Sequence, residues 1–96
     1  MSLYFVRHQH APETCPAKDP QKGGMLLQHI SKSNARNFGV ELRGDAVLDG
    51  KHTFVLILEA DEKSIIEQFM QPFAQTGTVE IIPASDCEVV VDRTSC

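Results

Sequence analysis

The chain of 96 residues lacks the features of several common protein classes. Its formal net charge is −4 and it has no basic stripe, which argues against nucleic-acid binding through phosphate contacts. No segment approaches the ~20 consecutive apolar residues of a membrane span. Arg7 interrupts the strand-like start of the chain before the apolar core of a signal peptide can form. We therefore expect a cytoplasmic, bacterial protein that binds neither membranes nor nucleic acids.

Cysteine is also scarce, and its spacing excludes a disulfide scaffold. The three thiols, Cys15, Cys87 and Cys96, are odd in number and far apart in the sequence. In a reducing compartment such thiols are ligands, reactive groups or packing residues. No repeat, low-complexity run or linker divides the chain, so we expect one domain over residues 1–96, with a tail of uncertain structure at 85–96.

The first half of the chain predicts a strand, a loop and a helix. Residues 3–10 alternate as a strand, and the prolines within 11–19 favour a loop. Asp19-Pro20 is typical of a helix start, with a capping carboxylate and proline in the first turn. We expect a break or a second short helical turn between Ser31 and Asn37, and Gly39 is a suitable end. The residues that we expect this helix to direct inward are Met25, Leu26, Leu27 and Ile30.

The second half predicts a hairpin, a helix and a last strand. Asp49-Gly50 separates strands 40–48 and 51–59. Asp61 is the expected cap of the next helix, which should bend or end at Pro72. A strand near 78–82 follows. The tail is ambiguous, because Ser85-Asp86-Cys87-Glu88 resembles a helical capping box whereas Val89-Val90-Val91 favours a strand. The helical stripe consists of Ile65, Ile66, Phe69, Met70 and Phe73.

This βαββαβ order predicts an α+β fold of the ferredoxin-like, split βαβ type. Right-handed crossovers place the four strands in the order 4-1-3-2, all antiparallel, with two helices on one face. Both faces of strand 51–59 are apolar, although the helices can cover only one side. A second copy of the sheet is the simplest cover for the other side, so we expect a homodimer paired sheet to sheet.

The most specific chemistry lies at the end of the first strand. His8 and His10 project from the same face of that strand, and Cys15 follows in the loop. If strands 3–10 and 51–59 are neighbours, and if His52 faces the same side of the sheet as His8 and His10, then His52 lies close to those two histidines. Neutral imidazole and thiolate are preferred ligands of zinc, nickel and copper. The four residues predict a closed tetrahedral site, or a site of three ligands with one exchangeable position.

The element order and the Asp49-Gly50 hairpin resemble those of the dimeric α/β-barrel superfamily, in particular its small bacterial ferredoxin-like domains. The resemblance implies a fold and a dimer more than an activity. Some small members of that superfamily bind nickel or other transition ions. Others are monooxygenases, lactone isomerases or dehydratases.

Besides a purely structural or regulatory dimer whose histidines hydrogen-bond to backbone, two interpretations of function stay open at this point. The first is a transition-metal protein that stores, senses or is stabilised by its ion, because no separate acid–base machinery is visible. The second is an enzyme that uses Cys15 as a nucleophile or holds a metal, with a small-molecule ligand in a cavity. The residues expected to line that cavity are Phe5, Phe54, Leu56 and Phe69.

The other candidate ligands have simpler expected roles. His29 on the first helix is expected to be a surface or packing residue. Cys87 is expected to be a small buried hydrophobe. Cys96, at the end of the sequence, either frays or, if the tail doubles back, lends a sulfur to the site.

Overall fold

Four strands form one antiparallel sheet in the order β2-β3-β1-β4, in a computed structural model that describes residues 1–96. This confirms the predicted α+β, ferredoxin-like order, with β1 and β3 in the centre. β1 pairs with β3 on one side and β4 on the other, and β2 pairs with β3. The strands are β1 (Ser2–His10), β2 (Glu41–Leu48), β3 (Thr53–Ala60) and β4 (Gly77–Ala84).

Each of the two predicted helices is divided into two shorter ones. The first ends at His29 with Ile30 as its C-cap. Ser31 caps the next helix, because its hydroxyl accepts a hydrogen bond from the backbone N–H of Asn34 at 3.3 Å. Met70 makes the second break, two residues before Pro72. None of the helices has the length and apolar character that a membrane span requires. The helices are α1 (Pro20–His29), α2 (Lys32–Asn37), α3 (Lys63–Phe69), α4 (Gln71–Ala74) and α5 (Cys87–Asp92).

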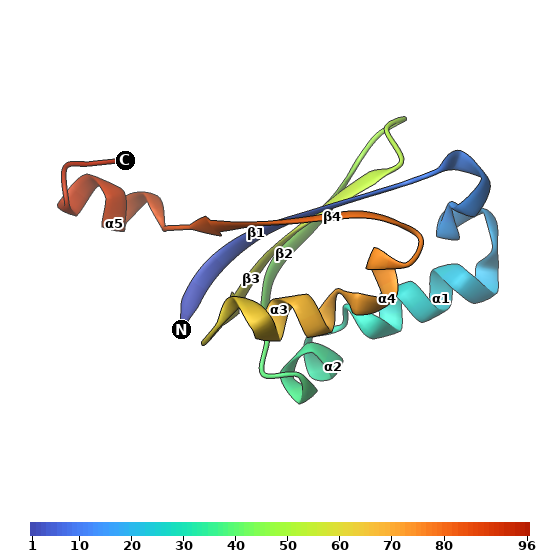
Figure 1. The fold of residues 1–96 in the computed structure, drawn as a ribbon, viewed down its shortest axis with the longest axis horizontal. Helices are drawn as coiled ribbons and strands as arrows, with labels where there is room; N and C mark the ends of the chain where they lie inside the picture. The colour runs from blue at the N-terminus through green and yellow to red at the C-terminus, as the bar shows by residue number, and fades with distance from the viewer.

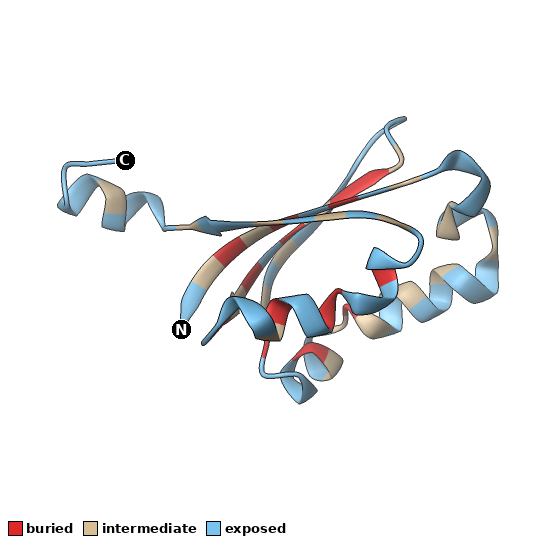
Figure 2. Cartoon of the chain, viewed as in Figure 1, coloured by how far each residue is buried: buried red, intermediate tan, exposed pale blue.

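Helices α1 to α4 lie on one side of the sheet, and the core fills the space between them (Figure 1). Alternate residues of β1 and β3 point into this space, as the period of two along a strand requires. Figure 2 shows the buried segments of α3 and of the strands facing each other. The largest fully buried side chains are Phe69, Leu56, Leu58, Ile66, Met70, His8, Val6 and Val40.

The helix ends follow the sequence only in part. Asp19 caps α1 as predicted, and its carboxylate accepts a hydrogen bond from the backbone N–H of Gln21 at 2.9 Å. The Asp61 prediction is wrong, because α3 begins at Lys63 after Glu62, which makes no capping bond. The tail forms α5 after Asp86, which resolves its ambiguity in favour of a helix.

The prediction for the inward face of α1 is wrong at Met25 and Leu27, which are both exposed. Ile30 is buried and Leu26 packs partly against the core. Helix α1 lies at one end of the molecule in Figure 1, beside the loop that follows β1, and it has no fully buried residue.

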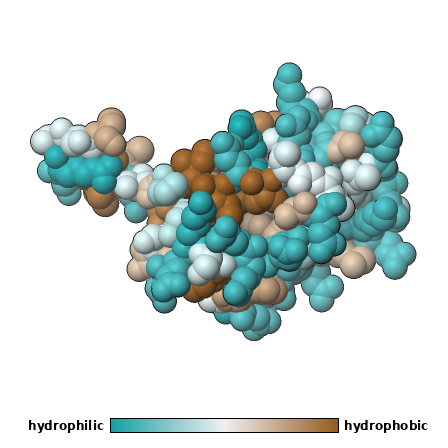
Figure 3. Space-filling model, in the orientation of Figure 1, coloured by the Kyte–Doolittle hydropathy of each residue, from teal (hydrophilic) through white to brown (hydrophobic).

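The opposite face of the sheet has no helix over it (Figure 1). Its centre is apolar, since Phe5 of β1 lies between Ile57 of β3 and Ile82 of β4 in register. Ile57 is 42% exposed and Ile82 is 41% exposed. Hydrophobic surface also gathers over the region of β4 in Figure 3. We call Leu3, Phe5, Val55, Ile57 and Ile82 the open-face patch.

Candidate metal centre

Three segments bring His10, Cys15 and His52 together at one end of the sheet. His10 is the last residue of β1, and His52 directly precedes β3. The backbone N–H of His10 donates to the carbonyl of His52 at 3.0 Å, which fixes the two residues side by side. Cys15 lies between two short 3-10 turns, Pro12–Thr14 and Pro16–Lys18. The fold therefore holds one histidine at the end of β1 and the other in the turn before β3, and it presents the thiol from a loop.

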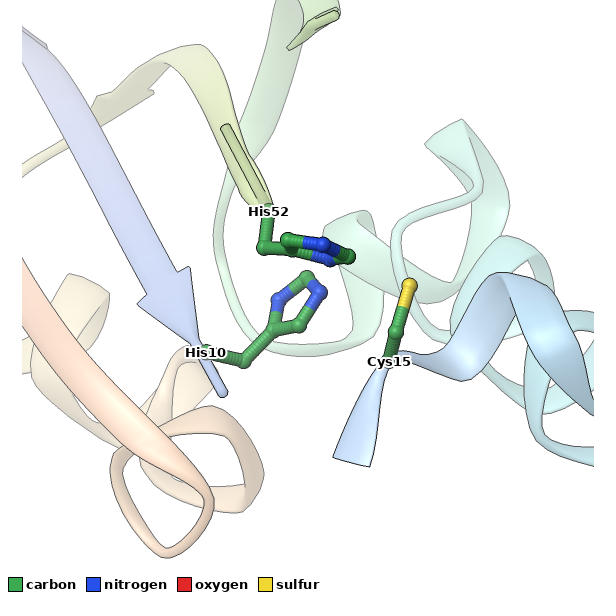
Figure 4. Close-up of side chains that lie close together, drawn as sticks. All are labelled: His10, Cys15 and His52. Carbon is green, nitrogen blue, oxygen red and sulfur yellow. The ribbon is translucent and has the colours of Figure 1, made fainter. Parts of the chain in front are cut away.

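The side chains of these three residues converge. One ligand atom of each, an imidazole nitrogen or the sulfur, lies within 4.8 Å of the others. The rings of His10 and His52 meet edge to face, with centroids 5.6 Å apart. Figure 4 shows the Cys15 sulfur directed toward the two rings. All three residues are half-buried, so the cluster is partly shielded from water.

His10 has an unusual environment for a histidine. Both of its ring nitrogens are buried and neither has a hydrogen-bond partner. An unpartnered buried polar group is unfavourable by about 1–3 kcal/mol, and most such groups in proteins are satisfied. Burial lowers the pKa of His10 below its ordinary value, and the neighbouring His52 lowers that pKa further. Both effects favour the neutral ring over the protonated one, and the neutral ring is the form that binds a metal ion.

His8 lies deeper in the molecule, in the aromatic end of the core. It is 1% exposed and contacts Phe54 and Phe73, while its ring stacks on that of His10 with centroids 5.4 Å apart. Its Nδ1 lies 3.0 Å from the carbonyl oxygen of Thr78, to which it donates. Burial lowers the pKa of His8, and the hydrogen bond to Thr78 partly opposes this. His8 is not among the three residues whose ligand atoms converge.

Residues 3–95 match the family described as "Domain of unknown function (DUF3303)". The chain belongs to this family. No curated protein matches the chain.

A cavity of about 230 Å³ opens beside the three converging residues of this DUF3303 domain. It lies between the tip of the β2–β3 hairpin and the turns around Cys15. His10, Cys15 and His52 form part of its wall, and Asp49 adds a carboxylate. The rest of the wall is mostly apolar and consists of Pro16, Ala17, Leu26, Val47, Leu48, Gly50, Thr53 and Phe54.

The structure brings together three of the four predicted ligands. His52 satisfies the expected parity, although it reaches the site from a turn residue and not from within the strand. His29 matches its expected packing role, since its Nε2 donates to the carbonyl of Phe69 at 2.7 Å. Cys96 and Cys87 lie at the α5 end of the DUF3303 domain, away from the cluster, and both are exposed (Figure 1). The expectation that Cys87 is buried is therefore wrong.

Of the residues expected to line a cavity between the sheet and the helices, the structure confirms only Phe54, which lies in the wall of the cavity beside the cluster. Leu56 and Phe69 are buried in the packed core, and Phe5 lies on the opposite face of the sheet. The cavity beside the cluster was not predicted in this place. The sequence feature that indicates this cavity is the apolar pair Val47-Leu48, directly before the hairpin turn. It predicts a cavity only if the loop that carries Cys15 is known to lie against that turn.

Proposed function

We propose that this DUF3303 domain binds a late transition metal ion, zinc, nickel or copper, through His10, Cys15 and His52. The observation that carries the proposal is the pair of unpartnered, buried nitrogens of His10 beside a second imidazole and a thiol. Coordination would give one of those nitrogens the partner that the protein does not supply. Two imidazoles and a thiolate favour late transition ions, whereas magnesium and calcium prefer oxygen ligands.

The spacing of the three groups is close to that of a bound ion. A tetrahedral zinc ion with ordinary bond lengths separates its nitrogen and sulfur ligands by about 3.3–3.6 Å. The donor atoms here lie within 4.8 Å of one another, so they must approach by up to roughly 1 Å. The Cys15 loop, with no buried residue in either of its 3-10 turns, is the segment best able to move.

In this proposal His8 supports the site without binding the ion. Its Nδ1 is engaged by Thr78, and its ring stacks on His10. We assign the ion to storage, sensing or stabilisation, because Asp49 is the one carboxylate in the cavity wall and is exposed at the hairpin turn. We also propose that the protein works in the cytoplasm, where the Cys15 thiol stays reduced.

The test is elemental analysis of protein purified without a tag or chelator. We expect about one zinc, nickel or copper ion per chain, which would be lost in His10→Ala and Cys15→Ser. His29→Ala is the matched control, because that histidine is also half-buried but bonds to backbone. No metal in the unmodified protein, or equal loss in His29→Ala, would contradict the proposal.

Thiol labelling gives an independent reading of the same site. Bound metal should slow the alkylation of Cys15 at least about tenfold, because coordination removes the free thiolate that reacts. Cys87 and Cys96 are exposed and serve as internal controls, whose labelling should not respond to metal.

We further propose that two copies pair through the open-face patch. The patch is apolar and uncovered, and an ion pair between Arg7 and Glu80 at 2.7 Å borders it. A twofold axis would place the same patch on both copies, which is the commonest arrangement in homodimers.

A further inference from the structure

The proposed centre has three protein ligands, one fewer than a tetrahedral ion takes. Three protein donors leave a tetrahedral ion with one open position, as in exchangeable and catalytic sites. Two further polar side chains line the cavity, but neither belongs to the converging group. Thr53 already donates its hydroxyl to the carbonyl of Lys51 at 2.9 Å. Asp49 is exposed at the hairpin turn. The chain therefore leaves the fourth position to a molecule from outside.

The cavity determines what kind of molecule can reach that position. All three proposed ligands line its wall, so an ion held by them borders this space. Its volume of about 230 Å³ holds roughly seven or eight groups of the size of a water molecule. Leu26, Val47 and Phe54 offer apolar surface, and burying an apolar group against them is favourable by about 25 cal/mol per Å².

Charge narrows the choice further. A divalent ion with one thiolate and two neutral imidazoles carries a net charge of +1. Asp49 is exposed to solvent at the hairpin turn, where water screens its charge, so it compensates the ion only weakly. An uncompensated charge is unfavourable in the apolar part of the cavity, so the fourth ligand should bring one negative charge. A small carboxylate or thiolate meets this requirement and provides an oxygen or sulfur donor.

We infer that the open position accepts a small organic monoanion, a carboxylate or thiolate, whose compact apolar group fills the cavity beside Val47, Leu48 and Phe54. The inference rests on the proposed metal site. The protein would thus carry a ternary complex of chain, ion and ligand, in which the ion selects the charged end and the cavity selects the apolar end.

The experiment uses the full chain loaded with Co²⁺, a coloured substitute for zinc whose visible absorption reports the ligands around the ion. Benzoate and acetate are titrated in parallel, since they share the carboxylate and differ in the apolar group. Both should change the cobalt bands, and benzoate should bind at least about tenfold more tightly, because only its phenyl group can bury apolar surface.

Two matched variants test whether the cavity causes the preference for benzoate over acetate. Val47→Asp places a carboxylate on the cavity wall at a position that is 67% exposed, so the fold should tolerate it. We expect this variant to bind Co²⁺ but to lose the preference for benzoate. Val91→Asp makes the same change at a position on α5 that is 72% exposed and does not line the cavity, and it should behave as the unmodified protein.

The same titration distinguishes failure of anion binding from failure of metal binding. If Co²⁺ binds but neither anion changes its spectrum, the chain fills the fourth position itself and the inference is overturned, while the metal site stands. Equal affinities for acetate and benzoate would also overturn it, because the cavity would then contribute nothing. Failure to bind Co²⁺ would overturn both.

Discussion

His52 has a backbone conformation that its side chain disfavours. Its φ angle of 49° lies in the left-handed region, which costs an L-residue roughly 1–2 kcal/mol because the Cβ crowds the backbone. Gly50, two residues earlier in the same turn, has a φ of 74° without such a cost. Such a conformation at a candidate site is a reason to look for a function of the side chain. The proposed metal site offers one, because an imidazole is needed at this position.

This strain predicts that His52→Gly separates stability from metal binding. Glycine relieves the left-handed strain, although it also gains more freedom in the unfolded chain. We expect the metal-free variant to be as stable as the unmodified protein or up to about 1 kcal/mol more stable, by denaturant unfolding. Its affinity for Zn²⁺ should fall at least about tenfold, by competition with a coloured chelator. A variant that unfolds more easily, yet binds Zn²⁺ normally, would assign the histidine to stability alone.

The sequence predicts the site residues at the level of chemistry but not of environment. His10, Cys15 and His52 are recognisable because their spacing follows the strand ends and the hairpin. His8 points to the same face of β1 as His10. It lies two residues earlier in the strand, inside the core, where it contacts Phe54 and Phe73. Periodicity shows which face a residue occupies. It does not show where along that face the packed aromatic side chains end and the cavity begins.

At the scale of the elements, the β1–β4 pairing holds the site in shape. Gly77 begins β4 and lies opposite His10 in the register. A Cβ at this position would overlap the carbonyl group of Gln9, so the two strands can approach only because residue 77 has no side chain. The backbone of His10 is therefore fixed from both sides, by β4 and by the hydrogen bond to His52.

We predict that Gly77→Ala destabilises the domain by about 2 kcal/mol, because the added methyl group must displace backbone and not a flexible side chain. It should also weaken Zn²⁺ binding, since His10 would move with its strand. Thermal or denaturant unfolding measures the first effect and metal titration the second. Gly24→Ala is the control. Its Cβ would meet no atom within 4 Å, and alanine favours helix α1, so this change should not destabilise the protein.

The sequence predicts which elements form more reliably than it predicts how they pack. The strand order follows from the alternation of strands and helices and from the handedness of the crossovers. The break at Ser31 is also predicted, but the exposure of Met25 and Leu27 is not. That exposure depends on which elements α1 packs against, and the sequence of the helix alone does not determine this. The same apolar spacing predicts a buried helix face whether or not a strand lies beneath it.

At the scale of the whole molecule, one sheet face is packed and the other is bare. Helices α1 to α4 bury the first, and their burial supplies the core. The open-face patch lies in the middle of the second, across β3, β1 and β4. Patches of this kind mark interfaces more often than they mark a monomer's solvent-exposed surface. The proposed dimer rests on this asymmetry.

We predict that the protein has twice the mass of its 10.6 kDa chain in sedimentation equilibrium, and that Ile57→Glu makes it monomeric. Ile57 lies opposite Phe5 near the middle of the patch, so a twofold axis would bring two carboxylates into a desolvated interface. Like charges placed there should weaken pairing at least about 100-fold. Leu27→Glu, at an exposed position on α1, makes the same change on the helical side and should leave the dimer intact. If the unmodified protein is a monomer, the proposed pairing is wrong. If Ile57→Glu is still a dimer, the two copies pair through a surface other than the open-face patch.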